Sequence, residues 1–304
     1  MVRGFRSGLA ACSLSAAAAC TPDFQSPSQV TDLRVLAIQQ EADGGFADAF
    51  VDLATPSVEQ VQVKALVVDP RARRGLVAHA RICSPTDSGR CDTPELTPQF
   101  DGAEPAIVQE PEYTLQVPPE TIAQALQSDD LKGFGGVRVQ FSLEADDGDP
   151  RGPAMASKVL LYTTAPESMR NHNPEIVALE ITQDGADKAT VLPGGNFSVT
   201  QGVEYGLRPV LGTGGAGIEE YDTVDLSGNL VHLSEEPRYS FFATIGVDFD
   251  RDDADEPLPG QPQPQNGIAR FTPSKDCGSI WVVARDGRGG IGWIGVRCTA
   301  TSAP

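Results

Sequence analysis

Positive charge is scarce in this 304-residue sequence, which has 23 Lys and Arg against 42 Asp and Glu and a formal net charge of −19. Its only local concentration of basic residues is formed by Arg71, Arg73 and Arg74. So acidic a surface repels phosphate backbones, which removes nucleic acid from the expected partners. The acidity is typical instead of a surface that keeps a protein soluble outside the cell.

Catalytic motifs are missing as well. The sequence contains no G-x-S-x-G, H-E-x-x-H or S-x-x-K set of the kind that serine and zinc hydrolases use. The three histidines, His79, His172 and His232, lie in strand-like runs or in a turn, where a surface or packed role is the more common one. Acidic residues are so plentiful that a catalytic carboxylate pair stays open as an alternative.

The sequence also lacks an apolar run long enough to cross a bilayer. Arg3 and Arg6 give a positive start, and the thirteen residues from Ser7 to Ala19 carry no charge. A membrane-spanning helix needs about twenty apolar residues, so this stretch predicts a cleaved export signal at residues 1–19.

Small residues precede a cysteine at the end of this signal. Ala17-Ala-Ala-Cys20 resembles the bacterial lipobox, in which cleavage leaves a cysteine that carries lipid. This resemblance implies a palmitate-type lipid on Cys20, although Ala17 stands where the lipobox usually has Leu. Leu9-Ala-Ala-Cys12 fits the pattern better, but only five residues separate Arg6 from Cys12, too few for the apolar core of a signal peptide, which is about seven to fifteen residues long.

The lipid would be followed by a polar tether at residues 20–29, which contains two prolines. Residue 21 is Thr rather than the Asp that often retains lipoproteins at the inner membrane. We therefore expect a lipid-anchored protein of the cell envelope, at the outer rather than the inner membrane.

Four cysteines remain beyond the signal: Cys83, Cys91, Cys277 and Cys298. An even number in an exported chain suggests disulfides, and the short separations favour Cys83–Cys91 and Cys277–Cys298. Loop-closure entropy would make these bonds worth about 2.6 and 3.4 kcal/mol. Zinc is the alternative, but no Cys-x-x-Cys occurs and no histidine neighbours a cysteine at ligand spacing.

Strand patterns dominate the rest of the chain. Apolar and polar residues alternate most cleanly over 137–143, and Pro118 starts the only convincing helical stretch, which runs to about Leu126. Short strands separated by Gly and Pro are typical of antiparallel sandwiches. We predict an all-β chain with two sandwich domains in tandem, at 30–168 and 172–300, joined by a turn-rich hinge at Asn171-His-Asn-Pro174.

Two segments of the second half carry a family resemblance. Arg238-Tyr-Ser-Phe-Phe-Ala-Thr-Ile-Gly246 and the later Ile280-Trp-Val-Val-Ala-Arg-Asp-Gly-Arg-Gly-Gly290 are similar to immunoglobulin-like and polycystic-kidney-disease-type modules. The layout of lipid cysteine, tether, strands and final Arg-Asp-Gly-Arg-Gly-Gly turn resembles lipoproteins of myxobacteria. The resemblance implies an immunoglobulin-like fold and an envelope location, and it implies no activity.

Five aspartates crowd one loop: Asp248, Asp250, Asp252, Asp253 and Asp255. Carboxylates at alternate positions can converge on Ca²⁺, which takes six to eight oxygen ligands. The spacing resembles the start of D-x-D-x-D calcium loops, but the twelfth position is Pro259 rather than Glu, so the loop is no EF-hand. The loop is therefore a candidate calcium site, with a solvated acidic loop as the alternative reading.

Taken together, these patterns predict a non-enzymatic envelope lipoprotein that acts in binding, adhesion or assembly. Its partners would be the membrane, through the lipid on Cys20, and a protein or glycan ligand at the envelope. No cofactor is expected other than calcium. The alternative is an exported hydrolase with a carboxylate site.

Overall fold

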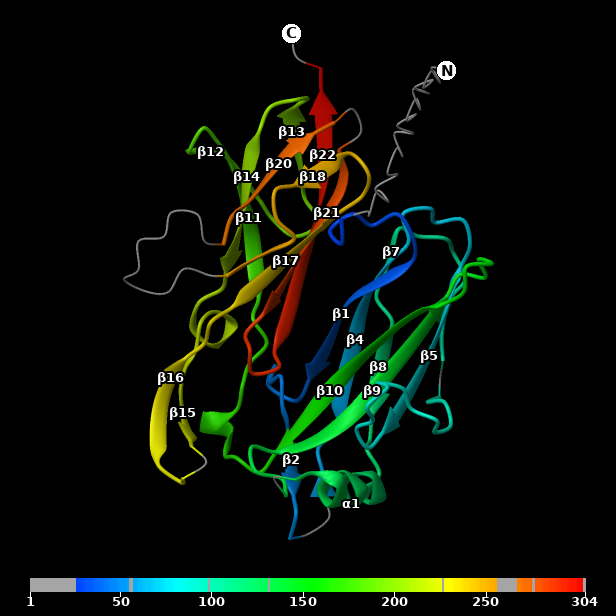
Figure 1. The fold of residues 1–304 in the computed structure, drawn as a ribbon, viewed down its shortest axis with the longest axis vertical. Helices are drawn as coiled ribbons and strands as arrows, with labels where there is room; N and C mark the ends of the chain where they lie inside the picture. The colour runs from blue at the N-terminus through cyan, green and yellow to red at the C-terminus, as the bar shows by residue number, and fades with distance from the viewer. Residues whose placement is uncertain are drawn as a thin grey trace, which may run out of the picture.

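The structure, a computed structural model, describes residues 26–302 except 55–56, 98, 131, 226, 256–266 and 275–276. Strands dominate these residues and form two β-sandwiches that follow one another along the chain (Figure 1). The predicted all-β, immunoglobulin-like fold class is confirmed. The expected signal peptide, Cys12, Cys20 and the tether up to residue 25 lie outside the described residues.

The first sandwich encloses its core between two sheets. One has the order β1-β4-β7, with β8 also paired to β4; the other has the order β3-β2-β10-β9-β5-β6. The bounds are β1 Arg34–Glu41, β2 Ala49–Asp52, β3 Ser57–Val58, β4 Val61–Val68, β5 Leu76–Cys83, β6 Phe100–Gly102, β7 Val108–Gln109, β8 Glu112–Leu115, β9 Val137–Asp146 and β10 Ala154–Thr163.

The second sandwich is also built from two sheets, of orders β12-β11-β14-β20-β18 and β13-β22-β21-β17-β19, and a separate hairpin, β15–β16, projects from it (Figure 1). The bounds are β11 Ile176–Gln183, β12 Ala186–Val191, β13 Asn196–Thr200, β14 Tyr205–Leu211, β15 Glu220–Val224, β16 Leu230–Ser234, β17 Arg238–Ala243, β18 Val247–Phe249, β19 Asp253–Asp255, β20 Ala269–Pro273, β21 Gly278–Arg285 and β22 Ile291–Thr301.

Helical structure is limited to α1 (Pro119–Ser128) and two 3₁₀ turns, η1 (Glu167–Met169) and η2 (Gly214–Ala216), within the described residues. The expected helix therefore forms, and it begins at Pro119, where the missing proline N–H has no partner to lose. Ile122 and Ala125 are its buried side chains, and they join the core of the first sandwich. None of the described helices is long and apolar enough to cross a membrane.

Alternation decides which face of a strand is buried. In β5, Leu76, Ala78 and Ala80 are at most 2% exposed and enter the core, while the residues between them are half-buried. Burying a side chain such as that of Leu76 contributes about 1.5–3 kcal/mol relative to leaving it in water. The period of two seen in the sequence is thus the period of core contacts in the fold.

The two sandwiches share one plan. In each, the last long strand pairs in parallel with a short early strand: β10 with β2, and β22 with β13. The other named strand pairs are antiparallel, as predicted. Parallel partners need a long connection, and here nearly a whole sandwich separates them in sequence. Hairpin patterns in the sequence therefore do not predict the pairing of the short strands β2 and β13.

An apolar interface joins the sandwiches. Leu36, Leu66 and Val68 from β1 and β4 pack against Trp281 and Val283 from β21, and all five are at most 6% exposed. This cluster lies outside both sandwich cores and on the outer face of β21. The sheet face that an isolated sandwich would leave in water is therefore partly covered by its neighbour.

Candidate functional site

The residues nearest the predicted lipid anchor lie on the second sandwich. Val30 donates its N–H to the Ala243 carbonyl at 2.8 Å, and Ala243 donates its N–H to the Ser28 carbonyl at 2.8 Å. Gln29 thereby bridges Ala243 in parallel at the end of β17. Val30, the first residue of the predicted first sandwich, has its side chain fully buried in the interface between the two sandwiches.

The acidic loop holds this N-terminal segment. Ser26 Oγ donates to Asp252 Oδ1 at 2.7 Å, and Gln29 Nε2 donates to Asp248 Oδ1. Two of the five candidate calcium ligands are thus engaged by residues more than 200 positions away in the sequence.

The other three aspartates face different partners. Asp250 Oδ1 accepts from the Arg270 backbone N–H at 2.8 Å, while Asp253 and Asp255 both pair with Arg238. Their D-A-D alternation belongs to the edge strand β19, which buries Ala254 between the half-buried Asp253 and the exposed Asp255. Within the described residues, no group of three or more His, Cys, Asp or Glu side chains is arranged to hold a metal ion. The calcium site stays a prediction.

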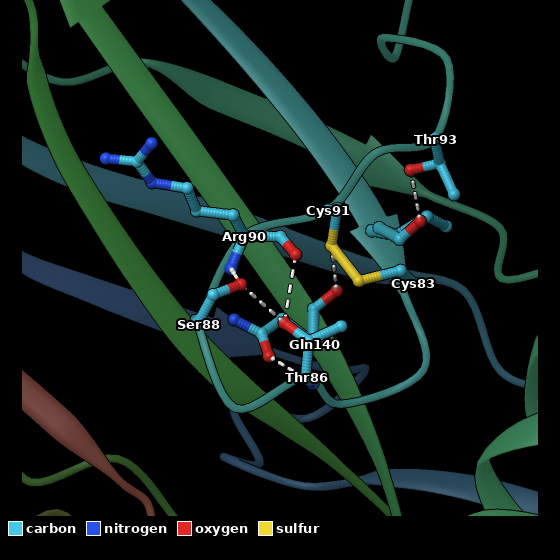
Figure 2. Close-up of a disulfide and its surroundings, with 8 residues drawn as sticks. Cys83, Thr86, Ser88, Arg90, Cys91, Thr93 and Gln140 are labelled. Carbon is cyan, nitrogen blue, oxygen red and sulfur yellow. Dashed lines mark hydrogen bonds between the residues drawn. A yellow bond between two sulfur atoms is a disulfide. The ribbon is translucent and has the colours of Figure 1, made fainter.

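The structure contains both expected disulfides. Cys83 and Cys91 close a short loop after β5, with their Cα atoms 5.6 Å apart (Figure 2). The loop covers the outer face of β9, where Gln140 Oε1 accepts from the Thr86 N–H at 3.1 Å. Gln140 is only 4% exposed, so a strand that the alternation predicts to be half-buried is covered on both faces.

The second disulfide lies inside a sandwich. Cys277 precedes β21 and Cys298 lies in β22, with Cα atoms 5.2 Å apart. They are 2% and 6% exposed and belong to the apolar core. This bond therefore ties the start of β21 to β22 within the core, whereas the first ties down a surface loop.

The predicted Arg-Asp-Gly-Arg-Gly-Gly turn forms the junction between the sandwiches. Asp286 Oδ1 accepts from the backbone N–H groups of Arg288, Gly289 and Gly290 at 2.7–2.9 Å. Its second oxygen, Oδ2, accepts from Asn171 Nδ2 at 2.9 Å. Asp286 is 2% exposed, so one buried carboxylate organises the turn and fixes the connector between the domains.

The connector between the sandwiches, residues 171–174, forms hydrogen bonds with both of them. Asn173 Oδ1 accepts from the Ile291 N–H at 3.0 Å, and Asn173 Nδ2 donates to the Gln40 carbonyl at 2.7 Å. Lys158 of the first sandwich donates to the Gly289 carbonyl at 2.7 Å, and burial lowers the pKa of this lysine to about 8. Both sandwiches thus contact the same turn.

Arg288 joins the turn to the projecting hairpin. Its Nη1 lies 3.2 Å from a carboxylate oxygen of both Glu219 and Glu235, which flank the hairpin on either side. Its guanidinium also lies over the Tyr221 ring, 3.9 Å from the centroid. An isolated two-stranded hairpin is marginal in water, so these contacts at its base explain how β15–β16 stays in place.

Glu219 and Glu235 are the obvious carboxylate pair for a hydrolase. Burial, with a further contribution from the nearby Asp286 charge, raises the pKa of Glu235 to about 7. However, Glu235 Oε2 accepts from the Glu219 backbone N–H at 3.1 Å and Glu235 is 3% exposed. Its carboxylate is occupied at the base of the hairpin and offers no access to a substrate.

Each histidine also pairs with a carboxylate. The Nδ1 atoms of His79, His172 and His232 lie 3.0, 2.7 and 2.8 Å from oxygens of Glu95, Glu219 and Asp222 respectively. A carboxylate-oriented imidazole is one part of a nucleophilic triad, but among the described residues none of the three also forms a hydrogen bond with a Ser, Thr or Cys side chain. The three pairs belong to different elements and form no common site.

No protein family and no curated protein matches the sequence. Among solved structures, the chain is similar to a red sea bream transglutaminase, at 10% identity over 90% of this chain and 32% of that one, with a TM-score of 0.24. A trypsin-activated α2-macroglobulin from Escherichia coli gives 10% identity over 90% and 17%, with a TM-score of 0.22. The chain thus spans at most about a third of either protein, and we draw no function from likenesses this distant.

Proposed function

We propose that this chain is a lipoprotein of the cell envelope, anchored through lipid on Cys20, whose sandwiches serve a non-enzymatic binding or assembly role. Its two disulfides support an address outside the cytoplasm, because such bonds persist in oxidising compartments. The export signal and the lipobox-like Ala17–Cys20 segment support the anchor.

The observation that carries the proposal is the attachment of residues 26–30 to the second sandwich. Ser26 follows Cys20 by only six residues, and an extended chain spans at most about 3.5 Å per residue. A lipid on Cys20 would therefore keep the edge bearing Asp248 and Asp252 within about 20 Å of the membrane surface. The anchor would therefore hold the two sandwiches close to the membrane in a set position, because the tether is too short to let them move far from it.

The joined sandwiches suit a binding role. The apolar cluster around Trp281 and the turn organised by Asp286 fix the first sandwich against the second, so the distance of each from the bilayer would be set as well. Such a body presents surfaces at a constant height above the membrane, which favours docking of an envelope partner. The outer membrane is the address that Thr21 favours.

The anchor is tested with Cys20→Ser and its matched control, Cys12→Ser. We expect the native protein and the control to fractionate with membranes and to carry lipid on a new N-terminal cysteine, detected by mass spectrometry of the N-terminal peptide. Cys20→Ser should be released or remain unprocessed, because stable membrane residence requires more than one acyl chain. Lipid on the Cys20→Ser protein would refute the assignment.

A further inference from the structure

A groove of about 750 Å³ runs between the two sandwiches. Its floor is the outer face of β21 and β22, and one wall is the segment around β7, where Ile107 and Val108 are both 39% exposed. Both tryptophans of the chain, Trp281 and Trp293, line it. Ligand sites are commonly found at domain interfaces and combine aromatic walls with a few polar groups.

Trp281 lies at the bottom of this groove and is 2% exposed. Its indole crosses Gly295, where a Cβ atom would sit 3.1 Å from Nε1 and 3.0 Å from Cδ1. Within the part of the chain that the structure describes, the indole N–H makes no hydrogen bond, and Nε1 is not among the fully buried unpaired atoms, so it stays accessible from the groove. A donor is therefore left open at the floor of the groove.

Trp293 is held in a fixed orientation. Its Nε1 donates to Glu110 Oε1 at 2.8 Å, across the two sandwiches. Lys64 Nζ pairs with the other Glu110 oxygen at 3.0 Å and lies 5.9 Å from the centroid of the indole. The half-buried ring is thus positioned before any ligand arrives, which lowers the entropy lost on binding.

Polar side chains surround the rings. Arg297 and Asn196 are exposed along the groove, and Ser279 is half-buried at its floor. With Glu110 they supply a guanidinium, an amide, a hydroxyl and a carboxylate, so the lining both donates and accepts hydrogen bonds. This mixture matches hydroxyl groups, which also do both.

We propose that the groove binds a neutral glycan. A sugar ring would stack on Trp293, a hydroxyl would accept from the Trp281 N–H, and Asn196 and Arg297 would bind hydroxyls at the rim. The C–H face of a pyranose is apolar and its edge is polar, which is the distribution that this lining complements. The net charge of −19 disfavours polyanionic chains.

A peptide is the less favoured occupant. The strands of the floor are paired on both sides, β21 with β17 and β22, and β22 with β21 and β13, so the floor offers no free main-chain edge. The wall strand β7 has an open edge but is two residues long. Strand addition relies on main-chain hydrogen bonds along an edge, and this groove provides little room for them.

The inference deepens the proposed function by naming a ligand class, and it is tested without reference to the anchor. Because the chain has only two tryptophans and both line the groove, its intrinsic fluorescence reports on this site. The full mature protein is titrated with cellotriose, maltotriose and the trimer of N-acetylglucosamine. We expect a saturable spectral shift with at least one trisaccharide below about 10 mM.

Variants then locate the binding. Arg297→Met and Asn196→Ala alter exposed side chains and should each weaken binding at least threefold, measured by calorimetry, while Trp293→Ala should weaken it at least tenfold. Leu230→Ala, on the distant hairpin where Leu230 is 69% exposed, is the matched control and should bind as the native protein does. Near-native circular dichroism keeps the comparison valid, and Arg297→Met and Asn196→Ala test the site even if Trp293→Ala misfolds.

The glycan assignment fails if none of the three sugars gives a saturable response, or if the groove variants bind as tightly as Leu230→Ala. It also fails if an extended apolar hexapeptide saturates the signal when no sugar does. These results would leave lipidation of Cys20 untouched, just as a failed lipidation test would leave sugar binding to the purified protein untouched.

Discussion

The two sandwiches use one strand plan but are reinforced in different places. The first carries its disulfide in a surface loop after β5 and an added helix, α1, before β9. The second carries its disulfide between β21 and β22 in the core, and its addition is the β15–β16 hairpin. The same strand plan is therefore cross-linked by a surface-loop disulfide in the first sandwich and by a core disulfide in the second.

The connections between the last two long strands differ in the same way. After β9, Asp149 pairs with Arg71 at 2.6 Å, and all the charged partners of this turn belong to the first sandwich. After β21, Asp286 binds its own turn and the connector Asn171. The β9–β10 turn thus stabilises its own sandwich, whereas the equivalent β21–β22 turn joins the two sandwiches. Strand topology alone therefore does not set the role of a turn.

The largest difference should follow removal of each disulfide. Cys277→Ala with Cys298→Ala should destabilise the second sandwich by about 3–5 kcal/mol, because it removes loop-closure entropy and packed core sulfur. Cys83→Ala with Cys91→Ala should cost about 2–3 kcal/mol and mainly free the loop over Gln140. Urea unfolding monitored by circular dichroism measures both. Equal losses would contradict the distinction between core and surface bonds.

The turns should differ by a smaller amount. Asp286→Ala leaves three N–H groups of the turn without their acceptor, of which that of Gly290 is buried, and it releases Asn171, so we expect a loss of about 2–3 kcal/mol and faster proteolysis of residues 170–174. Asp149→Ala removes partly exposed pairs and should cost less than about 1 kcal/mol. Asp286→Asn keeps one acceptor oxygen and should fall between them. Unchanged proteolysis in Asp286→Ala would show that the apolar cluster alone fixes the domains.

Local patterns in the sequence predict a good part of this fold. Alternation locates the long strands, Pro118 and Pro119 mark the start of α1, and close spacing pairs the cysteines. Each of these signals is local in sequence, and the longest separation is the 21 residues between Cys277 and Cys298. Apolar alternation also misleads locally, because Gln140 and Ser142 of β9 are polar and yet buried, Gln140 under the disulfide loop.

The site depends on partners that are far apart in sequence. Gln29 meets Asp248 across 219 positions, and Trp293 meets Glu110 across 183. No periodicity encodes such contacts, so the sequence could identify the aspartates but not the segment that engages them. The Asp253-Ala-Asp255 spacing fits a calcium loop and an edge strand equally well, so the sequence could not predict the pairing of β19 with β17.

The smallest expected effect is a pH dependence of stability that affects the β15–β16 hairpin and not the first sandwich. Glu235 is 3% exposed, and burial raises its pKa from 4.5 to about 7, with Asp286 adding to the rise and Arg288 opposing it. The folded state therefore keeps a proton that the unfolded state gives up above about pH 4.5. The stability that this proton contributes is complete below that pH and is lost as pH rises through about 7.

Between about pH 5.5 and 7, linkage predicts a loss of about 1–2 kcal/mol at the base of the hairpin. Hydrogen exchange of the amides in β15 and β16, corrected for the intrinsic rate, should show this loss, while strands of the first sandwich stay constant. Glu235→Gln should abolish the dependence because its amide does not titrate, and Glu95→Gln in the first sandwich is the matched control. His172→Gln separates the contribution of the imidazole beside Glu219. A hairpin whose protection is flat across this range in the native protein would mean that Arg288 keeps Glu235 ionised throughout, and the raised pKa would then be wrong.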